Sequence, residues 1–229
     1  MARAKLNLLL MAIIFLVAGN IAAAQNCGCA DMVSQEFFDG LTNQADPSCE
    51  AKGFYTRDAF LAAWQSYSGF AEGPTTDDSK REIAAFFAHV FHETIHMCYK
   101  DQGDKFDAYC DSSSQEYPCT PGKMYYGRGP LQISWNYNYG PAGQEIGFDG
   151  LNWPEGVSID PIISFKTALW FWMRNVHGII GQGFGATIQA INGVIECGGR
   201  NQGAVNDRVN LYQYYCGQFN VSPGDNLYC

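Results

Sequence analysis

The sequence predicts a mainly α-helical domain that is stabilised by disulfides and works outside the cell. Apolar residues recur three or four positions apart in several segments, which is the spacing of one buried helix face. Only the short run Leu131–Ser134 alternates as a strand does. The nine cysteines follow an N-terminal export signal, and cysteines in secreted chains usually form disulfides.

The N-terminus has the three parts of a secretory signal peptide. Arg3 and Lys5 precede an apolar run from Leu8 to Val17, and Ala22–Ala24 supplies the small residues of a cleavage site. The run is shorter than the roughly 20 apolar residues that a membrane helix needs. We therefore expect residues 1–24 to be removed from a secreted, extracellular protein that has no membrane partner.

Composition narrows the class of ligand. The formal net charge is −9 at pH 7, which argues against a nucleic-acid partner or an anionic membrane. Aromatic residues make up 14% of the chain, and many lie in Gly- and Asn-rich segments outside the periodic runs. Aromatic faces beside amide side chains suit neutral sugar rings. We expect a monomer that binds a neutral substrate and uses no cofactor and no metal.

Helical spacing defines most of the predicted secondary structure. In chain order, the expected helices are Val33–Thr42, Thr56–Tyr67 with Thr56 as its N-cap, a central helix that begins at Arg81, Ser164–His177 with Ser164 as its cap, Ala186–Ile191 extended toward Cys197, and Val205–Tyr215. In the helix after Ser164, the spacing of Phe165, Ala168, Leu169 and Trp172 predicts a place in the core. Gly178–Gly185 is interpreted as a flexible link.

The segment between the central helix and Ser164 lacks long periodicity. Asp101–Tyr126 combines Gly, Pro, Ser and Cys with several Tyr, so we expect an ordered loop that is tied by a disulfide. Leu131–Ser134 follows as a short strand. This strand could belong to a Gly-rich hairpin with packed tyrosines, but neutral hydrogen-bonding side chains are dense here and favour a binding wall. They are Gln132, Ser134, Asn136 and Asn138.

The apolar stripe of the central helix ends in the ionisable motif HETIH, for which three interpretations compete. A single Glu near a helix end is most often solvated. His-Glu-x-x-His on a helix could instead place His92 and His96 on one face to hold zinc, with Glu93 as general base. Alternatively, apolar neighbours such as Phe91 and Ile95 could keep Glu93 protonated so that it serves as an acid.

Several longer motifs resemble one known family. They are Phe86–Cys98 with its HETIH, YYGRGPLQISWNYNYGPAG (Tyr125–Gly143), FKTALWFWM (Phe165–Met173), INGVIECGG (Ile191–Gly199) and PGDNLYC (Pro223–Cys229). Together they resemble the plant family 19 chitinases of glycoside hydrolases, and most of all the short class IV type. The resemblance implies a lysozyme-like fold: two mostly helical lobes, a substrate cleft and a small β-sheet on one wall. It also implies endo-acting, inverting hydrolysis of chitin, the β-1,4-linked polymer of N-acetylglucosamine, in plant defence.

The resemblance also suggests how the chain is divided. The predicted catalytic domain is 33–229. QNCGC, which begins at Gln25, resembles the opening of a small Cys-rich chitin-binding module, so residues 25–32 are interpreted as a remnant of that module. Cys27 and Cys29 are one residue apart, and a bond between them would be strained.

The matched motifs assign roles to individual residues. Glu93 matches the family's general acid, and Glu196 matches a carboxylate that pairs with Arg208, which projects away from the apolar face of the last helix. The matched substrate-binding positions are Tyr117, Gln132, Ser134, Tyr137, Asn138, Asn192 and Arg208. The matching implies the disulfides Cys49–Cys98, Cys110–Cys119 and Cys197–Cys229, and it leaves Cys216 unpaired.

Gln102 is the main departure from the family's pattern. An inverting glycosidase needs a second carboxylate, roughly 6.5–9.5 Å from the acid, to activate water, and the pattern places it where this chain has Gln102. A carboxamide can orient water but cannot take its proton. Asp101, Asp104 or Asp107 would then have to act as the base. Ile95 is a second departure, because it is bulky where a small residue or Thr is usual.

Two further functions stay open from the sequence. A chain without the second carboxylate could be a non-catalytic chitin-binding or regulatory protein. A zinc protease would need a third ligand besides His92 and His96, from His89, His177 or a distant acid such as Glu116. An assay with a soluble chitin oligomer separates these functions. A chitinase would cleave the oligomer, a non-catalytic protein would bind it without cleavage, and a zinc protease would do neither.

Overall fold

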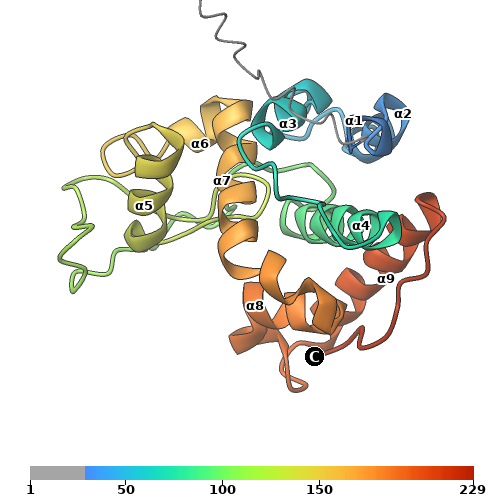
Figure 1. The fold of residues 1–229 in the computed structure, drawn as a ribbon. Coiled ribbons are helices and arrows are strands. Elements are labelled where there is room, and N and C mark those ends of the chain that lie inside the picture. Colours follow the sequence, from blue (N-terminus) through green and yellow to red (C-terminus); the bar gives the residue numbers. More distant parts are fainter. Residues whose placement is uncertain (1–28) are drawn as a thin grey trace, which may run out of the picture.

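The computed structural model describes residues 29–229 and shows a mainly helical protein (Figure 1). The expected signal peptide, residues 1–24, and the segment around Cys27 lie outside the described residues. The helices in chain order are α1 (Cys29–Met32), α2 (Gln35–Thr42), α3 (Arg57–Trp64), α4 (Thr76–Glu93), α5 (Asn136–Ile146), α6 (Gly156–Ile159), α7 (Pro161–Asn175), the 3₁₀ helix η1 (His177–Gln182), α8 (Phe184–Glu196) and α9 (Gln202–Gln218).

Two lobes lie on either side of α7, as the sequence predicted (Figure 1). In the larger lobe, α4 packs on α9 and α3 packs on α7. Phe165, Ala168, Leu169 and Trp172 of α7 are fully buried in the core of this lobe, which confirms the predicted apolar stripe. Trp170 belongs to a separate core, which stabilises the smaller lobe of α5, α6 and their loops. Helix α7 therefore joins two cores.

Side-chain caps mark the start of several of the longer helices. Thr56 caps α3, as predicted. Asp160, not Ser164, caps α7, where its carboxylate accepts hydrogen bonds from two backbone amides. Pro161 follows at the first helical position, where a missing N–H removes no helical hydrogen bond. The cap predicted at Ser164 is wrong, because the observed cap lies about one helical turn earlier.

The central helix also begins earlier than predicted. Thr75 accepts a hydrogen bond from a backbone amide of the first turn, so α4 begins at Thr76 and not at Arg81. It ends at Glu93. Asn201 caps α9 in the same way, and this last helix is longer at both ends than the predicted Val205–Tyr215.

Helix α5 was not predicted, because Gly140 and Pro141 interrupt its helical pattern. The packing of α5 against Tyr117 explains why position 140 is a glycine. A Cβ atom at this position would lie 2.2 Å from a ring atom of Tyr117, so only glycine lets the helix approach this ring. Helix α5 therefore depends on contacts that local propensity does not record.

The small sheet is reduced to two isolated antiparallel bridges among the described residues, Asp101–Arg128 and Arg128–Ile133. The predicted strand Leu131–Ser134 is wrong, because Gln132 has a φ of 46° and this left-handed conformation interrupts an extended backbone. The flexible link predicted at Gly178–Gly185 is also wrong. The 3₁₀ helix η1 covers most of it, and α8 begins directly afterwards.

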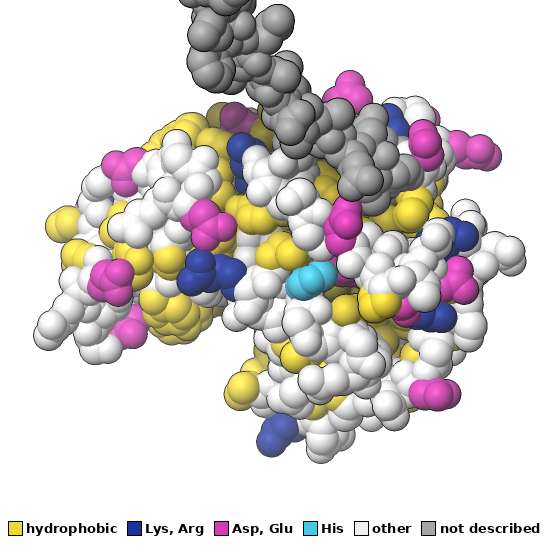
Figure 2. Space-filling view, viewed as in Figure 1, with side chains coloured by type: hydrophobic (Ala, Val, Ile, Leu, Met, Phe, Trp, Pro, Cys, Tyr) yellow, Lys and Arg dark blue, Asp and Glu magenta, His cyan; other side chains and the backbone are white. Residues whose placement is uncertain are grey.

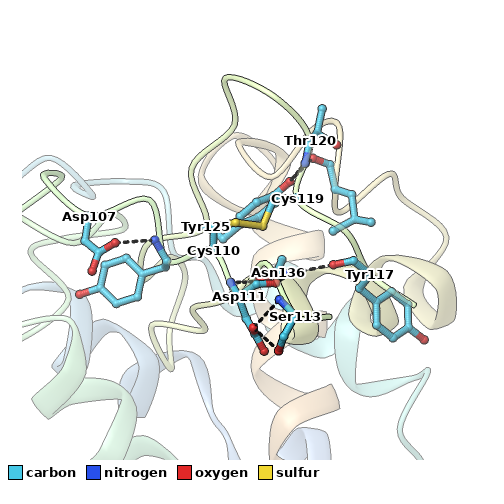
Figure 3. Close-up of a disulfide and its surroundings, with 11 residues drawn as sticks. Asp107, Cys110, Asp111, Ser113, Tyr117, Cys119, Thr120, Tyr125 and Asn136 are labelled. Atoms are coloured by element: carbon cyan, nitrogen blue, oxygen red, sulfur yellow. Dashed lines mark hydrogen bonds between the residues drawn. A yellow bond between two sulfur atoms is a disulfide. The ribbon is translucent and has the colours of Figure 1, made fainter. Parts of the chain in front are cut away.

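The long loop 101–126 is ordered and tied by the disulfide Cys110–Cys119, as predicted (Figure 3). The buried side chain of Asn136, at the start of α5, also holds the loop through hydrogen bonds to its backbone. Its Oδ1 accepts from the Asp111 amide at 2.7 Å, and its Nδ2 donates to the carbonyls of Asp111 and Tyr117 at 3.0 and 2.6 Å. The other implied disulfides, Cys49–Cys98 and Cys197–Cys229, are present as well, and Cys216 is a buried free thiol.

The surface reflects the acidic composition. Figure 2 shows Asp and Glu side chains spread over one face, with exposed hydrophobic side chains between them and no single Lys and Arg patch on that face. None of the helices in residues 29–229 is both long enough and apolar enough to cross a membrane.

Candidate active site

A cleft of about 1100 Å³ is lined by residues of both lobes. One wall comes from the end of α4, the turn after it and the last two turns of α8. The other wall comes from the start of loop 101–126 and from residues 127–138. Phe171 of α7 also contributes to the lining, so the helix that joins the two cores reaches the cleft.

Glu93 lines this cleft at the C-terminal end of α4. After Thr94, three consecutive residues have positive φ angles: Ile95 at 47°, His96 at 60° and Met97 at 60°. Because the helix ends before His96, the i, i+4 geometry that a zinc-binding HExxH motif needs is absent. His92 Nδ1 is instead 2.6 Å from an Asp207 carboxylate oxygen. The metal-site interpretation of this motif is therefore wrong.

The carboxyl of Glu93 is held by a buried arginine. Arg208 Nη2 donates to Glu93 Oε1 at 2.5 Å. The same guanidinium binds Glu196 through two bonds of 2.8 Å, from Nε to Oε2 and from Nη2 to Oε1. Arg208 is fully buried, Glu196 is 3% exposed and the Glu93 side chain is 17% exposed. Arg208 thus forms ion pairs with two carboxylates, Glu93 in the cleft and Glu196 behind the cleft wall.

Glu196 is ionised in this arrangement. Burial disfavours its charged form, but the hydrogen bonds and the charge of Arg208, together with a bond from Asn192 Nδ2 at 2.6 Å, outweigh burial and lower the pKa of Glu196. The backbone of Asn192 leaves helical geometry, with φ −144° and ψ 22° inside α8. Helix α8 is therefore kinked at the residue whose side chain donates to Glu196.

His89 completes the support of Arg208. Arg208 Nη1 lies 3.0 Å from His89 Nδ1, and an arginine can only donate, so Nδ1 accepts and the proton is on Nε2. Nε2 in turn donates to Thr187 Oγ1 at 2.8 Å, and this hydroxyl donates to the Phe184 carbonyl at 2.6 Å. Burial, reinforced by the charge of Arg208, holds the pKa of His89 well below its usual value. A neutral His89 therefore braces the guanidinium from behind.

The apolar environment predicted for Glu93 is wrong, and so is the solvated one. Phe91 is 1% exposed and stacks on His96 with ring centroids 4.5 Å apart. Ile95 is 63% exposed and lines the cleft, so it does not bury the Glu93 carboxyl. The described hydrogen-bond partner of the Glu93 carboxyl is the Arg208 guanidinium, so apolar side chains alone do not surround this group.

Gln102 also lines the cleft, and hydrogen bonds occupy both ends of its amide. Its Nε2 donates to the Tyr109 hydroxyl at 2.8 Å, and its Oε1 accepts from the Gly127 amide at 3.1 Å. Asp101 lines the cleft beside it, with a side chain that is 13% exposed. Among the described lining residues, Asp101 is the carboxylate besides Glu93. Asp104 and Asp107 are exposed and are not among the described residues of the lining.

The Asp101 carboxylate has several partners. Oδ2 lies 3.0 Å from Lys105 Nζ, and Oδ1 accepts a hydrogen bond from the Ser158 hydroxyl. Arg128, which is buried, has its Nε 3.7 Å from Oδ1. Positive charge therefore surrounds Asp101, and both of its oxygens already accept hydrogen bonds.

The sequence model of the family described as "Chitinase class I", glycoside hydrolase 19, matches residues 32–179 and 179–229. The chain belongs to glycoside hydrolase family 19. "Chitinase 4" of Oryza sativa subsp. japonica is 66% identical over 200 residues, which are 86% of this chain and 70% of the relative. "Endochitinase A" of Zea mays is 60% identical over 200 residues, 87% of this chain and 71% of the relative.

A solved structure agrees with this membership. The crystal structure of a family GH19, class IV chitinase from Zea mays has a TM-score of 0.84 and 59% sequence identity. The match covers 87% of this chain and 98% of that chain. The mainly helical, two-lobed architecture is therefore the lysozyme-like fold of this family, as the sequence predicted.

The structure brings most of the predicted site residues together. Glu93 and Gln102 line the cleft together with Gln132, Ser134, Tyr137, Asn138 and Asn192. Arg208 and Glu196 lie behind the Glu93 wall, so Arg208 is a buried support and does not project into solvent. Tyr117 is not among the described lining residues, and its hydroxyl donates to Gln144 Oε1 at 3.1 Å.

Sequence reasoning missed several lining residues. Trp135 has a φ of 75°, and its ring stacks on Tyr137 with centroids 5.8 Å apart and planes 10° apart. The polar and aromatic composition around Trp135 was a usable signal. His89 is buried behind the lining, and its role as a support gave no such signal, since its partner Arg208 is 119 positions away. Other missed lining residues include Tyr99, Tyr109, Phe171, Gln189, Ile191, Val194 and Ile195.

Proposed function

We propose that this chain is a secreted chitinase that cleaves internal β-1,4 linkages of N-acetylglucosamine polymers by an inverting acid/base mechanism. The observation that carries the proposal is the position of Glu93, in the wall of a long open cleft and fixed by the buried Arg208. The relatives' names support the same substrate class. The signal-like N-terminus supports secretion, and residues 33–229 form the catalytic domain.

In this mechanism, Glu93 is the general acid. Its carboxyl donates a proton to the glycosidic oxygen as the bond from this oxygen to the anomeric carbon breaks, a contribution of roughly 10²- to 10⁴-fold in rate. Proton transfer leaves a carboxylate, which Arg208 stabilises from 2.5 Å. Glu196 and His89 keep the guanidinium in place, so this stabilisation needs no rearrangement during the reaction.

The sugar units bind along the remaining lining. Gln132, Ser134, Asn138 and Asn192 present amide and hydroxyl groups that suit sugar hydroxyls and acetamido groups. The stacked rings of Trp135 and Tyr137 offer apolar faces for pyranose rings. Tyr117, which is outside the described lining, packs against Gly140 instead.

Asp101 is the residue that we assign as base. Inversion requires a carboxylate across the cleft that removes a proton from the attacking water. Gln102 cannot do this, because an amide is not basic enough and its two ends are already bonded. Asp101 is a carboxylate, it lines the same cleft, and Lys105 and Arg128 keep positive charge beside it. Both Asp101 oxygens already have hydrogen-bond partners, Lys105 and Ser158, which compete with the attacking water, so we expect slow turnover.

A non-catalytic chitin-binding protein is the second candidate, and one observation favours it. Gln102 occupies the position where the family's pattern has the catalytic base, and its hydrogen bonds to Tyr109 and Gly127 hold it in the cleft wall. A cleft with this wall could retain sugar binding after hydrolysis had been lost.

Turnover of a soluble N-acetylglucosamine hexamer tests these assignments. We expect slow hydrolysis by the wild type and at least a 100-fold loss in Glu93→Gln. Asp101→Asn should cause a similar loss, and Asp104→Asn is the matched control, because this exposed residue is not in the described lining. Thermal unfolding of each variant checks the fold.

Three other outcomes contradict parts of the proposal. An active Glu93→Gln protein would remove Glu93 from the mechanism. A tenfold or larger gain in Gln102→Glu, with Asp101→Asn unchanged, would show that the missing carboxylate is the defect and that Asp101 is not the base. A wild type that binds the hexamer without cleaving it would favour the non-catalytic candidate.

A further inference from the structure

Ile95 combines three features that packing does not explain. Its φ of 47° is in the left-handed region, which is a real outlier for a β-branched side chain. Its side chain is 63% exposed, so it adds little to the core. It lines the cleft two positions after Glu93. Strained residues of this kind persist where the surrounding structure fixes them, and they cluster at functional sites.

The turn around Ile95 is fixed on both sides. Thr94 Oγ1 donates to the Val90 carbonyl at 2.7 Å and accepts from the Met97 amide at 2.9 Å. The His96 amide donates to the Phe91 carbonyl at 2.8 Å. The turn then runs into the disulfide-bonded Cys98. Ile95 therefore presents its side chain to the cleft from a rigid backbone.

Two other branched apolar side chains are exposed in the same lining. Val194 is 82% exposed and Ile195 is 61% exposed, both in the last turn of α8. Single exposed apolar residues are common on protein surfaces, but these three line one cleft together with Glu93 and Asn192. Binding clefts typically combine apolar lining with a few polar groups that set orientation.

We propose that Ile95 is a specificity-determining residue that contacts the acetamido methyl group of the sugar beside Glu93. The proposal rests on the proposed chitinase function, since it names the chemistry that the same cleft selects. A deacetylated sugar has no such methyl group and carries an ammonium group in its place. Burying an ammonium group against a branched alkyl chain removes water without supplying a hydrogen bond. Ile95 would therefore favour N-acetylated over deacetylated sugar.

Binding by calorimetry, in the Glu93→Gln background so that no hydrolysis interferes, tests this role. The probes are the tetramer of N-acetylglucosamine and the tetramer of glucosamine. Ile95→Gly removes the side chain and suits the positive φ, so the fold should be retained. We expect the Kd for the acetylated tetramer to rise about tenfold, the low end of the range for a lost apolar contact. The Kd for the deacetylated tetramer should stay the same or fall, because the variant loses no contact with this sugar and no longer desolvates its ammonium group.

Phe106→Ser is the matched control. Phe106 is 96% exposed and is not among the described lining residues, so losing this apolar side chain should change neither Kd. An equal loss for both tetramers in Ile95→Gly would overturn the proposal and leave the chitinase function intact. Tighter binding of both would show that Ile95 obstructs the cleft, which also overturns it. Absence of acetylated tetramer binding by the Glu93→Gln parent would contradict the chitinase function itself.

Discussion

Arg208→Met should destabilise the protein strongly, in a way that depends on pH. The substitution keeps an unbranched apolar side chain but removes the charge that neutralises Glu196. Glu196 is 3% exposed, so its carboxylate would be left buried beside a single amide donor. Removing one partner of a buried ion pair costs about 3–5 kcal/mol. For a domain of this size, that corresponds to a fall in Tm of roughly 6–20 °C.

The pH dependence follows from the pKa of Glu196. In the wild type burial opposes ionisation, but Arg208 lowers the pKa below its usual value. The ionised form therefore stabilises the fold above the unfolded pKa, and this stability is lost as the pH falls through the folded pKa. In Arg208→Met only burial and one amide bond remain, so the carboxylate is penalised near pH 7 and relieved when it binds a proton. The difference in Tm between wild type and variant should thus be largest near neutral pH and shrink toward pH 4.

Calorimetric unfolding between pH 4 and pH 8 measures this difference. Arg174→Met is the matched control, because Arg174 pairs with Glu145 at 3.0 Å on the surface, with side chains 56% and 46% exposed. Such a pair contributes at most about 1 kcal/mol. Adding Glu196→Gln to Arg208→Met should restore part of the lost stability at pH 7. A loss that is independent of pH, or a double variant no more stable than Arg208→Met, would refute the buried-charge explanation.

Three other predictions concern the framework. Burial raises the pKa of the Cys216 thiol to about 11, so peptide mapping should find Cys216 unlabelled by a thiol reagent at pH 8 in the folded protein and labelled after unfolding; labelling of the folded protein would contradict this. Gly140→Ala places a methyl 2.2 Å from the Tyr117 ring and should cost about 1–3 kcal/mol in chemical denaturation, and an unchanged midpoint would argue against the contact. Replacing Cys197 and Cys229 by serine opens a loop with a sequence separation of 32 and should cost roughly 3–4 kcal/mol, whereas a loss under 1 kcal/mol would show that the loop is constrained by other contacts.

The longer helices of the larger lobe could be predicted because they have periodic apolar faces. The stripe that includes Phe165 and Trp172 is buried as expected, since the lobe needs one continuous core. Helix α5 could not be predicted, because Gly140 fits a contact with Tyr117 that forms only after folding. The start of α7 was misplaced for a simpler reason, as Asp160 and Ser164 are both good caps and only the structure shows which is used.

Part of the candidate site was also accessible from the sequence. The resemblance singled out Glu93 and paired Glu196 with Arg208, as the structure shows. Periodicity alone placed Arg208 away from the apolar face of its helix and did not show that it is buried, because a pattern contains no information on partners more than a hundred residues away. His89 was missed for the same reason. The left-handed turn after Glu93 was missed because His-Glu-x-x-His is usually read as a continuous helix, and this led to the zinc hypothesis.

The measurement that tests the central claim most directly is the anomeric form of the products from a soluble N-acetylglucosamine hexamer. Proton NMR during the first turnovers, before mutarotation, distinguishes the two forms. Inverting hydrolysis of a β linkage, with Glu93 as acid, predicts that the new reducing ends appear as the α anomer and that Glu93→Gln forms none. New reducing ends that appear as the β anomer would contradict inversion and a separate base, and the absence of any product from the wild type would contradict the assignment of this chain as an enzyme.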